Sequence, residues 1–328
     1  MIPEAWGALR GLPVRPAADG GLINATYYAG DPPRWVVQRV NPIFRPEVHE
    51  DIEAVTAHLA ARGLRTPRLL RTDAGRLCHL AEGGASWRVM DFVPGKTFHR
   101  VESPAIAEAG ARLVARFHLA VDDLRWDYRN VRPQAHDTRW HLAQLEAGLP
   151  RAEGEARAVA EAILEGWRTF GGRLDLPPRH VHGDLKISNL RFDDAGEALC
   201  LLDLDTLSRW PIDVELGDAW RSWCNPVGED SPDTRFDLDV FEAAVRGYVA
   251  VRALTREERE ALPFAAERIA LELASRFCRD TWEDSYFGWN SARFPSRPAH
   301  NLFRAKGQLA LARSARVQIA EMARVLGG

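Results

Sequence analysis

A polar octapeptide between two apolar runs constrains this chain more than any other feature. The octapeptide, HGDLKISN, occupies residues 182–189, and the apolar run ALCLL at residues 198–202 ends in Asp203, a leucine and Asp205. Short apolar runs that flank a polar loop are typical of buried strands. A carboxylate at the end of a buried strand costs free energy unless it is paired or binds a metal ion. The fold must therefore supply partners for these two carboxylates.

The octapeptide follows the pattern H-x-D-x-x-x-x-N, which is the spacing of a kinase catalytic loop. Phosphoryl transfer needs an acceptor hydroxyl aimed at the γ-phosphate and cations that spread the developing charge. Asp184 would act as the base, and Asn189 with Asp203 would offer oxygens to Mg²⁺. Lys186 would reach the transferring phosphate, and His182 is expected to be structural. The alternative is that the aspartates and the asparagine are turn or cap residues.

Composition indicates a globular protein and argues against several classes of function. The chain has 328 residues, 46% of them hydrophobic, and a net charge of −3 at pH 7. This charge gives no basic footprint for nucleic acid, and no apolar run approaches the roughly 20 residues of a membrane span. The start lacks a signal-peptide pattern, and the four cysteines form no CxxC pair. We therefore expect a cytoplasmic protein without nucleic-acid or membrane partners.

Residues 1–93 are predicted to form a small, strand-rich, nucleotide-binding lobe. The runs LINATYYA and RWVVQRV, separated by a turn at Asp31-Pro32-Pro33, predict a hairpin. Pro46 opens a predicted helix that ends before Gly63. The runs RLLRT and SWRVMDFV are further predicted strands.

After Pro94-Gly95 the pattern becomes helical, and residues 94–328 are predicted to form a catalytic and acceptor-binding lobe. The exception is 179–206, which predicts short buried strands around the octapeptide. Helical patterns cover 103–119, 138–147, 153–169, 235–251 and most of 256–326. The fold class is therefore a bilobed α+β architecture, in which sites commonly lie between the lobes.

With these residues in view, the chain resembles the aminoglycoside phosphotransferase/choline kinase superfamily, and within it most closely the N-acetylhexosamine 1-kinase group. The resemblance covers nearly the whole chain. The octapeptide and LDLDT are specific to the superfamily, whereas the flanking pieces point jointly to the sugar-kinase group. Those pieces are GGLINATYY, VVQRVNPIF, HEDIEAVTAHL, ELGDAWRSWCNP, RFCRDTWEDSYF and HNLFRAKGQLAL.

The resemblance implies a protein-kinase-like fold and ATP with Mg²⁺ as cofactors. It implies that Asp184 is the base, that Asn189 and Asp203 bind the metal, and that Asp205 is a second-shell or alternative ligand. It also implies that the adenine lies along a backbone segment formed by Met90, Asp91, Phe92 and Val93. A plain edge strand is the alternative for that segment.

The sequence departs from the protein-kinase pattern at the phosphate-binding lysine, because no lysine precedes Lys96. Arg39 is the basic residue within the VVQRV run, and we assign it to the nucleotide phosphates, although arginine does not replace lysine equivalently. Glu50 or Glu53 on the following helix is its candidate partner. Either glutamate has the alternative of being a solvated helical charge.

The nucleotide loop also departs from the pattern, since it lacks G-x-G-x-x-G. Gly20, Gly21 and Asn24 must serve if this loop covers the phosphates. The alternative for a Gly-Gly pair is a simple turn.

The acceptor pocket has several candidate residues. Asp218, Arg221 and Asn225 follow the metal-binding strand closely, and Tyr286 belongs to an aromatic cluster within residues 282–289 on a late helix. Asp218 and Arg221 could bind sugar hydroxyls and an acetamido group, or pair with each other across one helical turn. The aromatic cluster could form a ligand platform or, more commonly, core.

These residues lead to three hypotheses. The first is an ATP- and Mg²⁺-dependent kinase that acts on a hydroxyl of a small polar metabolite, with the anomeric hydroxyl of an N-acetylhexosamine as acceptor. The second keeps the chemistry and changes the acceptor to an aminoglycoside, a choline-like alcohol or an amino-acid hydroxyl, with acidic residues at 229–239 to hold a cation. The third, motivated by the missing lysine, is a catalytically silent nucleotide-binding protein.

Overall fold

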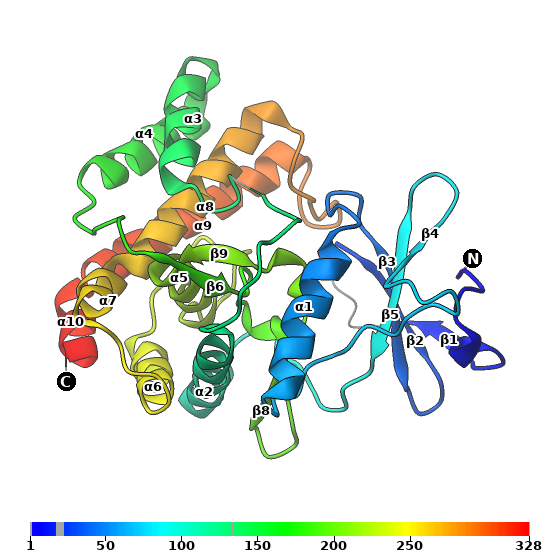
Figure 1. Ribbon diagram of the computed structural model, residues 1–328. Helices are drawn as coiled ribbons and strands as arrows, with labels where there is room; N and C mark the ends of the chain where they lie inside the picture. The colour runs from blue at the N-terminus through cyan, green and yellow to red at the C-terminus, as the bar shows by residue number, and fades with distance from the viewer. Residues whose placement is uncertain (1, 18–22, 133, 328) are drawn as a thin grey trace.

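The computed structural model describes residues 2–17, 23–132 and 134–327, and it has two lobes (Figure 1). The N-terminal lobe contains an antiparallel sheet with the strand order β1-β2-β3-β5-β4. Its strands are β1 (Val14–Pro16), β2 (Ala25–Ala29), β3 (Trp35–Val40), β4 (His79–Leu80) and β5 (Ser86–Asp91). Tyr27 of β2 pairs with Val37 of β3, so the predicted hairpin is confirmed.

Helix α1 (Val48–Ala61) lies between the sheet and the helical lobe (Figure 1). Its buried face includes Ile52, Val55 and Leu59, which recur at the spacing of one helical face. Gly63 follows the helix with a φ of 75°, a conformation that favours glycine. The helix predicted after Pro46 is therefore confirmed.

The strand predicted at RLLRT does not form a regular ladder. Leu69 makes only an isolated bridge to Met90 of β5. Strand β5 also pairs with β4 at its other end, where His79 lies opposite Trp87. The segment around Leu69 and strand β4 thus pair with different parts of the same edge of β5. Each pairing is too short to form a long strand.

The second lobe is mainly helical, with two pairs of short strands beside the octapeptide. The paired strands are β6 (Pro178–Val181) with β9 (Ser208–Pro211), and β7 (Leu190–Phe192) with β8 (Ala198–Leu201). The helices are α2 (Pro104–Val121), α3 (Thr138–Gly148), α4 (Gly154–Arg168), α5 (Ile212–Trp223), α6 (Leu238–Val249), α7 (Arg256–Ala261), α8 (Ala265–Glu283), α9 (Arg297–Arg316) and α10 (Ile319–Gly327). The predicted α+β class is confirmed. None of the described helices is both long and apolar enough to cross a membrane.

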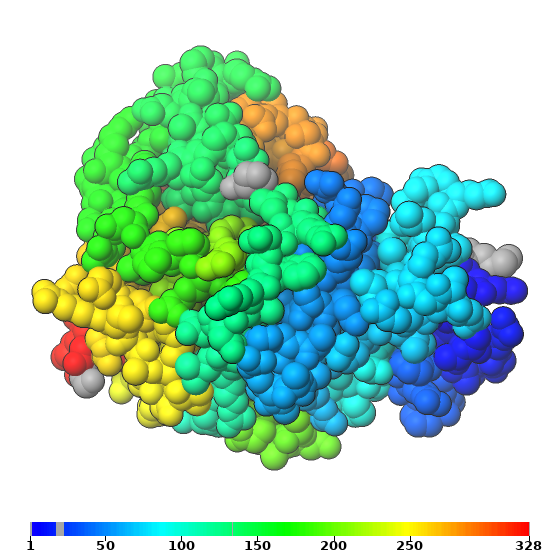
Figure 2. Space-filling view, in the orientation of Figure 1, coloured from blue at the N-terminus to red at the C-terminus, as the bar shows by residue number. Residues whose placement is uncertain are grey.

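The connection between the lobes is held against the second lobe. Gly95 has a φ of 132°, and a Cβ at this position would lie 2.3 Å from the carbonyl oxygen of Phe192. The next residue, Lys96, donates its backbone N–H to the same oxygen at 2.8 Å. The space-filling view shows the N-terminal lobe, in blue and cyan, packed directly against the helical lobe (Figure 2).

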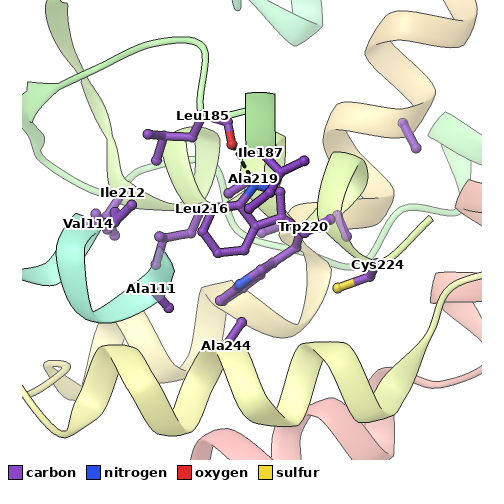
Figure 3. Close-up of a cluster of buried hydrophobic side chains, with 14 of the residues drawn as sticks. Ala111, Val114, Leu185, Ile187, Ile212, Leu216, Ala219, Trp220, Cys224 and Ala244 are labelled. Carbon is purple, nitrogen blue, oxygen red and sulfur yellow. Dashed lines mark hydrogen bonds between the residues drawn. The ribbon is translucent and has the colours of Figure 1, made fainter. Parts of the chain in front are cut away.

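A buried apolar cluster supports the octapeptide from within the helical lobe. Leu185 and Ile187 point into this cluster beside Leu216 and Trp220 of α5 (Figure 3). Full burial of each such aliphatic side chain contributes about 1.5–3 kcal/mol. Trp223, also on α5, donates its indole N–H to the carbonyl oxygen of Leu185 at 2.6 Å. The alternation of apolar and polar residues therefore anchors the octapeptide while its polar side chains face the other way.

Candidate active site

A buried carboxylate on α5 fixes the backbone of the octapeptide. Glu215 accepts hydrogen bonds from the backbone N–H groups of His182 at 2.8 Å and Gly183 at 2.9 Å. The Nε2 atom of His182 lies 2.7 Å from the carbonyl oxygen of Leu202. These contacts join the octapeptide to α5 and to the residue that follows β8. His182 is thus engaged in packing and hydrogen bonding.

Gly183 brings a second loop into contact with the octapeptide. Its φ is 83°, and a Cβ at this position would lie 2.4 Å from the carbonyl oxygen of Thr206. Both the backbone conformation and the close approach require glycine here. The short distance places the Asp203–Thr206 segment directly against the residue that precedes Asp184.

Two side chains of the octapeptide converge on the carboxylate of a third, Asp184. Lys186 Nζ lies 2.6 Å from Asp184 Oδ2, and Asn189 Nδ2 donates to the same oxygen at 3.0 Å and to the Asp184 carbonyl oxygen at 2.8 Å. Burial would lower the pKa of Lys186, but the carboxylates of Asp184 and Asp203 outweigh it and raise that pKa. The lysine is therefore a cation at neutral pH. Oδ1 of Asp184 has no hydrogen-bond partner among the described residues.

Asp203 is a carboxylate that forms no hydrogen bond or ion pair with the described residues, although the charges of Lys186 and Arg88 favour its ionised form. Burial and the nearby carboxylates of Asp205 and Asp184 raise its pKa to about 7. Its backbone is left-handed, with φ 57° and ψ 59°, a conformation that is uncommon for residues other than glycine. A bound cation would relieve the repulsion between the carboxylates, and the amide oxygen of Asn189 is a second suitable ligand. One carboxylate and one amide oxygen are the kind of donors that suit Mg²⁺ when phosphate oxygens complete its shell.

Asp205 has partners other than the expected metal ion. Its Oδ2 accepts from Arg88 Nη2 at 2.9 Å and from Asn24 Nδ2 at 2.7 Å, while Arg88 Nη1 pairs with its Oδ1. Burial would raise the pKa of Asp205, but Arg88 outweighs it and lowers that pKa. Both oxygens of this carboxylate are engaged, so the structure places Asp205 in an ion pair between the lobes.

The strand register separates the two candidate arginines of the N-terminal lobe. Arg88 lies opposite Gln38 in the β3–β5 ladder, whereas Arg39 lies opposite Trp87. Directly paired residues share one face of a sheet. Trp87 packs in a cluster on the outer face, and Arg39 is exposed there. The structure therefore brings Arg88, and not Arg39, to the cleft.

The two helical glutamates expected to pair with Arg39 have other partners. Glu50 pairs with Arg129, and Glu53 pairs with Arg68 and Arg71 at 3.3 Å each. These contacts are largely exposed and join α1 to neighbouring segments. Neither glutamate contacts a strand arginine.

A cleft of about 610 Å³ lies between the sheet and the octapeptide. Arg88 lines it, as do apolar side chains of β3 and β5 such as Val36 and Met90. The sequence-predicted site residues that line it are Asn24, Met90, Asp91, Phe92, Val93, Lys186, Asn189 and Asp203. Gly20 and Gly21 lie outside the described residues. The expected adenine segment and the expected metal ligands thus line one cavity.

Asp218 and Arg221 pair across one turn of α5, as in the structural alternative. Arg221 Nη2 lies 3.0 Å from Asp218 Oδ1, and its Nη1 lies 2.5 Å from Oε1 of Glu229. The other oxygen of Asp218 is buried without a hydrogen-bond partner in the described chain. Asn225 closes its own turn by donating to the carbonyl oxygen of Gly228 at 2.9 Å. Asp218 therefore keeps an unused acceptor atom, and so does Asn225, whose Oδ1 is also buried without a hydrogen-bond partner in the described chain.

Tyr286 does not line the interlobe cleft. Helix α8 ends at Glu283, and Asp284 adopts a left-handed conformation with a φ of 48°. The aromatic cluster expected on one late helix is therefore divided between the end of α8 and the loop that follows. Tyr286 and Trp289 are exposed in that loop, so the cluster is not core throughout.

Sequence reasoning missed three residues that organise the site. Arg88 and Glu215 were not identified, nor was Asn130, whose side chain donates to the carbonyl oxygen of Asp205 at 3.1 Å. A signal existed for Arg88, because it is the single cation inside the run SWRVMD. A charge within an apolar strand needs a buried partner. No comparable local signal distinguishes Glu215 or Asn130.

A family model described as "Phosphotransferase enzyme family" matches residues 14–268. Homoserine kinase of Acidiphilium cryptum is 31% identical over 225 residues, covering 65% of this chain and 64% of that protein. Homoserine kinase of Methylobacillus flagellatus is 26% identical over 268 residues, covering 81% and 78%. The chain thus matches less than two thirds of the length of the Acidiphilium relative.

Solved structures show the same fold at low identity. A microcompartment-associated aminopropanol kinase matches with a TM-score of 0.64 and 16% identity, covering 96% of this chain and 95% of that one. Amicoumacin kinase hAmiN, in complex with AMP-PNP and Ca²⁺, matches with a TM-score of 0.62 and 14% identity, covering 90% and 87%. At these identities the likeness concerns the fold.

Proposed function

Because this chain belongs to the phosphotransferase enzyme family, we propose that it transfers the γ-phosphoryl group of ATP, with Mg²⁺, to a hydroxyl of a small polar metabolite. One observation carries this proposal. Asp184 is held by Lys186 and Asn189 near the buried carboxylate of Asp203, next to a cavity of about 610 Å³. Positioning and electrostatic stabilisation supply most of the catalysis in phosphoryl transfer.

Asp184 orients the acceptor and takes its proton. Oδ2 is fixed by Lys186 and Asn189, so Oδ1 is the atom that receives the hydroxyl proton. Lys186 remains protonated and offers its charge to the phosphoryl oxygens. Asn189 and Asp203 would hold the Mg²⁺ ion, which neutralises phosphate charge when bound.

We assign to Arg88 the phosphate-binding role that the sequence had assigned to Arg39. Its guanidinium is fixed by Asp205 on one side and by Gln38 Oε1 on the other, at 2.8 Å from Nε and 2.7 Å from Nη2. It lines the cleft, and one N–H of its Nη1 atom has no partner among the described residues. A fixed guanidinium is suited to phosphate oxygens.

The adenine lies along the segment that follows β5. The backbone N–H of Phe92 donates to the carbonyl oxygen of Arg34, and the carbonyl oxygen of Val93 accepts from Arg191 Nε at 2.9 Å. The N–H of Val93 forms no hydrogen bond with the described residues. That N–H is the donor we assign to a ring nitrogen of the base.

An N-acetylhexosamine remains the leading acceptor, with its anomeric hydroxyl phosphorylated. Support comes from the quoted octapeptide and flanking motifs, and from the unused oxygen of Asp218, which suits a sugar hydroxyl. A second candidate is an amino-acid hydroxyl. The curated relatives named homoserine kinase favour it.

The test is ADP release with ATP and Mg²⁺ across N-acetylhexosamines, neutral sugars, homoserine, amino alcohols and aminoglycosides. We expect turnover with one acceptor class, lost in Asp184→Asn and kept in Asp194→Asn, an exposed carboxylate on the loop after β7. Thermal stabilisation by ATP without turnover on any acceptor would replace this proposal with a silent nucleotide-binding protein.

A further inference from the structure

A second pocket, of about 320 Å³, lies in the helical lobe and shares no lining residue with the interlobe cleft. It is formed by the start of α3, the last turns of α8 and the loop between α8 and α9. Figure 2 shows the green residues of the α3 region beside the orange residues of α8. The residues that carry the argument are Arg132, Trp140, His141, Arg276, Tyr286 and Phe287.

Two of the arginines in this pocket have no carboxylate partner. Neither Arg132 nor Arg276 is in an ion pair with any described residue, although the chain forms many such pairs. The third arginine, Arg279, pairs with Glu283 at 3.0 Å. Asp280 also lines the pocket, but its oxygens accept the backbone N–H groups of the following loop. Three arginines and two carboxylates line the pocket, so positive charge is in excess there.

The two unpaired guanidiniums point at one oxygen atom. Arg132 Nη2 and Arg276 Nη2 lie 3.2 Å and 3.5 Å from the Tyr286 hydroxyl oxygen. Burial would raise the pKa of Tyr286, but Arg276 and Arg132 outweigh it and lower that pKa. The hydroxyl oxygen therefore occupies a position that favours negative charge. Since 58% of this tyrosine is exposed, it can give way to a ligand.

The wall of the pocket offers a neutral polar group and aromatic surface. His141 is 5% exposed, and neither ring nitrogen forms a hydrogen bond with the described residues, although the backbone of Gln134 interacts weakly with the ring. Burial lowers its pKa to about 4, so the imidazole is neutral and keeps one donor and one acceptor. Trp140 and Phe287 supply the aromatic surface. A buried polar ring without partners indicates a missing ligand group.

A chain of contacts joins this pocket to the octapeptide. Trp210 lies against Gly183, and its ring is 4.8 Å from that of His136. His136 Nδ1 lies 2.9 Å from Glu272 Oε1. Arg276 is one turn further along α8 than Glu272. This series of contacts connects the pocket to Gly183 of the octapeptide.

We propose that this pocket binds the carboxylate of a small organic acid through Arg132 and Arg276, with His141 and the aromatic side chains contacting the rest of the molecule. Paired guanidiniums bind carboxylates with charge-assisted, directional hydrogen bonds. The carboxylate comes either from the phosphoryl acceptor itself or from a separate anion. The assignment of the carboxylate to the phosphoryl acceptor rests on the proposed function. The existence of the carboxylate-binding site does not.

The test is calorimetric binding of two matched pairs that differ in a carboxylate. One pair is glucuronate and glucose, and the other is homoserine and 3-aminopropan-1-ol. We expect the acid to bind about tenfold or more tightly than the partner that lacks the carboxylate, with glucuronate and glucose as the pair free of an ammonium group. Arg276→Gln and Arg132→Gln should each remove that difference, and Arg276→Lys should restore part of it. Arg139→Gln, an exposed arginine of α3 outside the pocket, should leave it unchanged.

Equal binding of the acid and of the partner without a carboxylate in both pairs would overturn the site, as would discrimination that persists in the Arg132→Gln/Arg276→Gln double variant. Thermal melting of each variant separates loss of the site from loss of the fold. ADP release then distinguishes the sources, because turnover of the bound acid places its carboxylate on the acceptor, and binding without turnover identifies a separate anion. Failure of phosphoryl transfer would leave the binding result intact.

Discussion

Arg88 of β5 and Asp205 form a two-point ion pair that joins the sheet to the loop after β8. The side chains of both residues are 1% exposed, and Nη2 of Arg88 lies 2.9 Å from Oδ2 of Asp205. The same carboxylate holds Asn24 at the start of β2. In protein kinases a helical glutamate holds the phosphate-binding cation. Here a carboxylate of the helical lobe holds Arg88, which ties the cation that we propose to bind phosphate to the segment that we propose to bind the metal.

Arg88→Lys should lower kcat/KM by roughly a hundredfold, because a lysine keeps the charge and loses the fixed fork that aligns the phosphates. Arg39→Met, on the outer face of the same sheet, should have little effect. Steady-state kinetics of both variants test this, with thermal melting to confirm folding. A large loss of kcat/KM in Arg39→Met, together with a wild-type value in Arg88→Lys, would assign the phosphate contact to Arg39.

Asp184→Asn should lower kcat by about 10²–10⁴ with the fold and ATP binding retained, because the amide cannot accept the hydroxyl proton. Single-turnover kinetics and calorimetric ATP binding check the two halves of this expectation. Wild-type turnover in a folded variant would contradict the assignment of the base.

Asp203→Asn should raise the Mg²⁺ concentration needed for half-maximal activity by at least about tenfold, since it removes a charged ligand. Asp205→Asn should instead weaken ATP binding and leave the Mg²⁺ requirement unchanged, because Asp205 holds Arg88. Activity titrated with Mg²⁺ at saturating ATP separates the two aspartates. An equal shift in both variants would make Asp205 a metal ligand.

The contrast between Asp184 and Arg88 shows how much of the site the sequence could reveal. Asp184, Lys186 and Asn189 lie within six residues, so their spacing alone predicted that they would meet. Arg88 and Asp205 are 117 positions apart, and no local pattern relates them. Arg39 and Arg88 both sit in strands with apolar residues on either side, so the sequence did not show which faced the cleft. Only the ladder register, with Gln38 opposite Arg88, decides that question.

The fold was predictable for a related reason. The hairpin, α1 and most helices depend on local turns and periodicity, which the sequence displays directly. The helical pattern after residue 256 hid the break at Asp284, because aromatic residues continued at helical spacing after the helix had ended. The pocket that contains Tyr286 exists only because the chain leaves α8 there, and so it was not foreseen.

Gly183→Ala should destabilise the protein strongly, because it combines a positive φ with a Cβ only 2.4 Å from the Thr206 carbonyl oxygen. Gly75→Ala is the matched control, since its φ is 76° and no atom lies within 4 Å of a Cβ there. The backbone strain of an alanine at a positive φ alone costs about 1–2 kcal/mol of folding free energy. Urea denaturation should show a larger loss in Gly183→Ala, and equal losses would mean that the contact with Thr206 relaxes freely.

The ion pair between His136 and Glu272 should make stability depend on pH in a defined window. Burial would lower the pKa of His136, but Glu272 outweighs it and raises that pKa, while His136 and neighbouring cations overcome burial to lower the pKa of Glu272 to about 2. A raised histidine pKa stabilises the fold fully below the unfolded value of 6.5, and the effect fades as pH rises through the folded pKa. The lowered glutamate pKa stabilises above its unfolded value of 4.5 and fades as pH falls toward 2.

His136→Gln should therefore cost about 2 kcal/mol of unfolding free energy near pH 5.5, where both groups are charged in the native protein. The cost should be smaller at a pH above the raised pKa of His136 than at pH 5.5, because the wild-type imidazole has then lost its proton and its charge interaction with Glu272. Urea denaturation of both proteins at the two pH values measures this difference. A cost that is equal at both pH values, or larger at the higher one, would show that His136 contributes by packing and neutral hydrogen bonding alone.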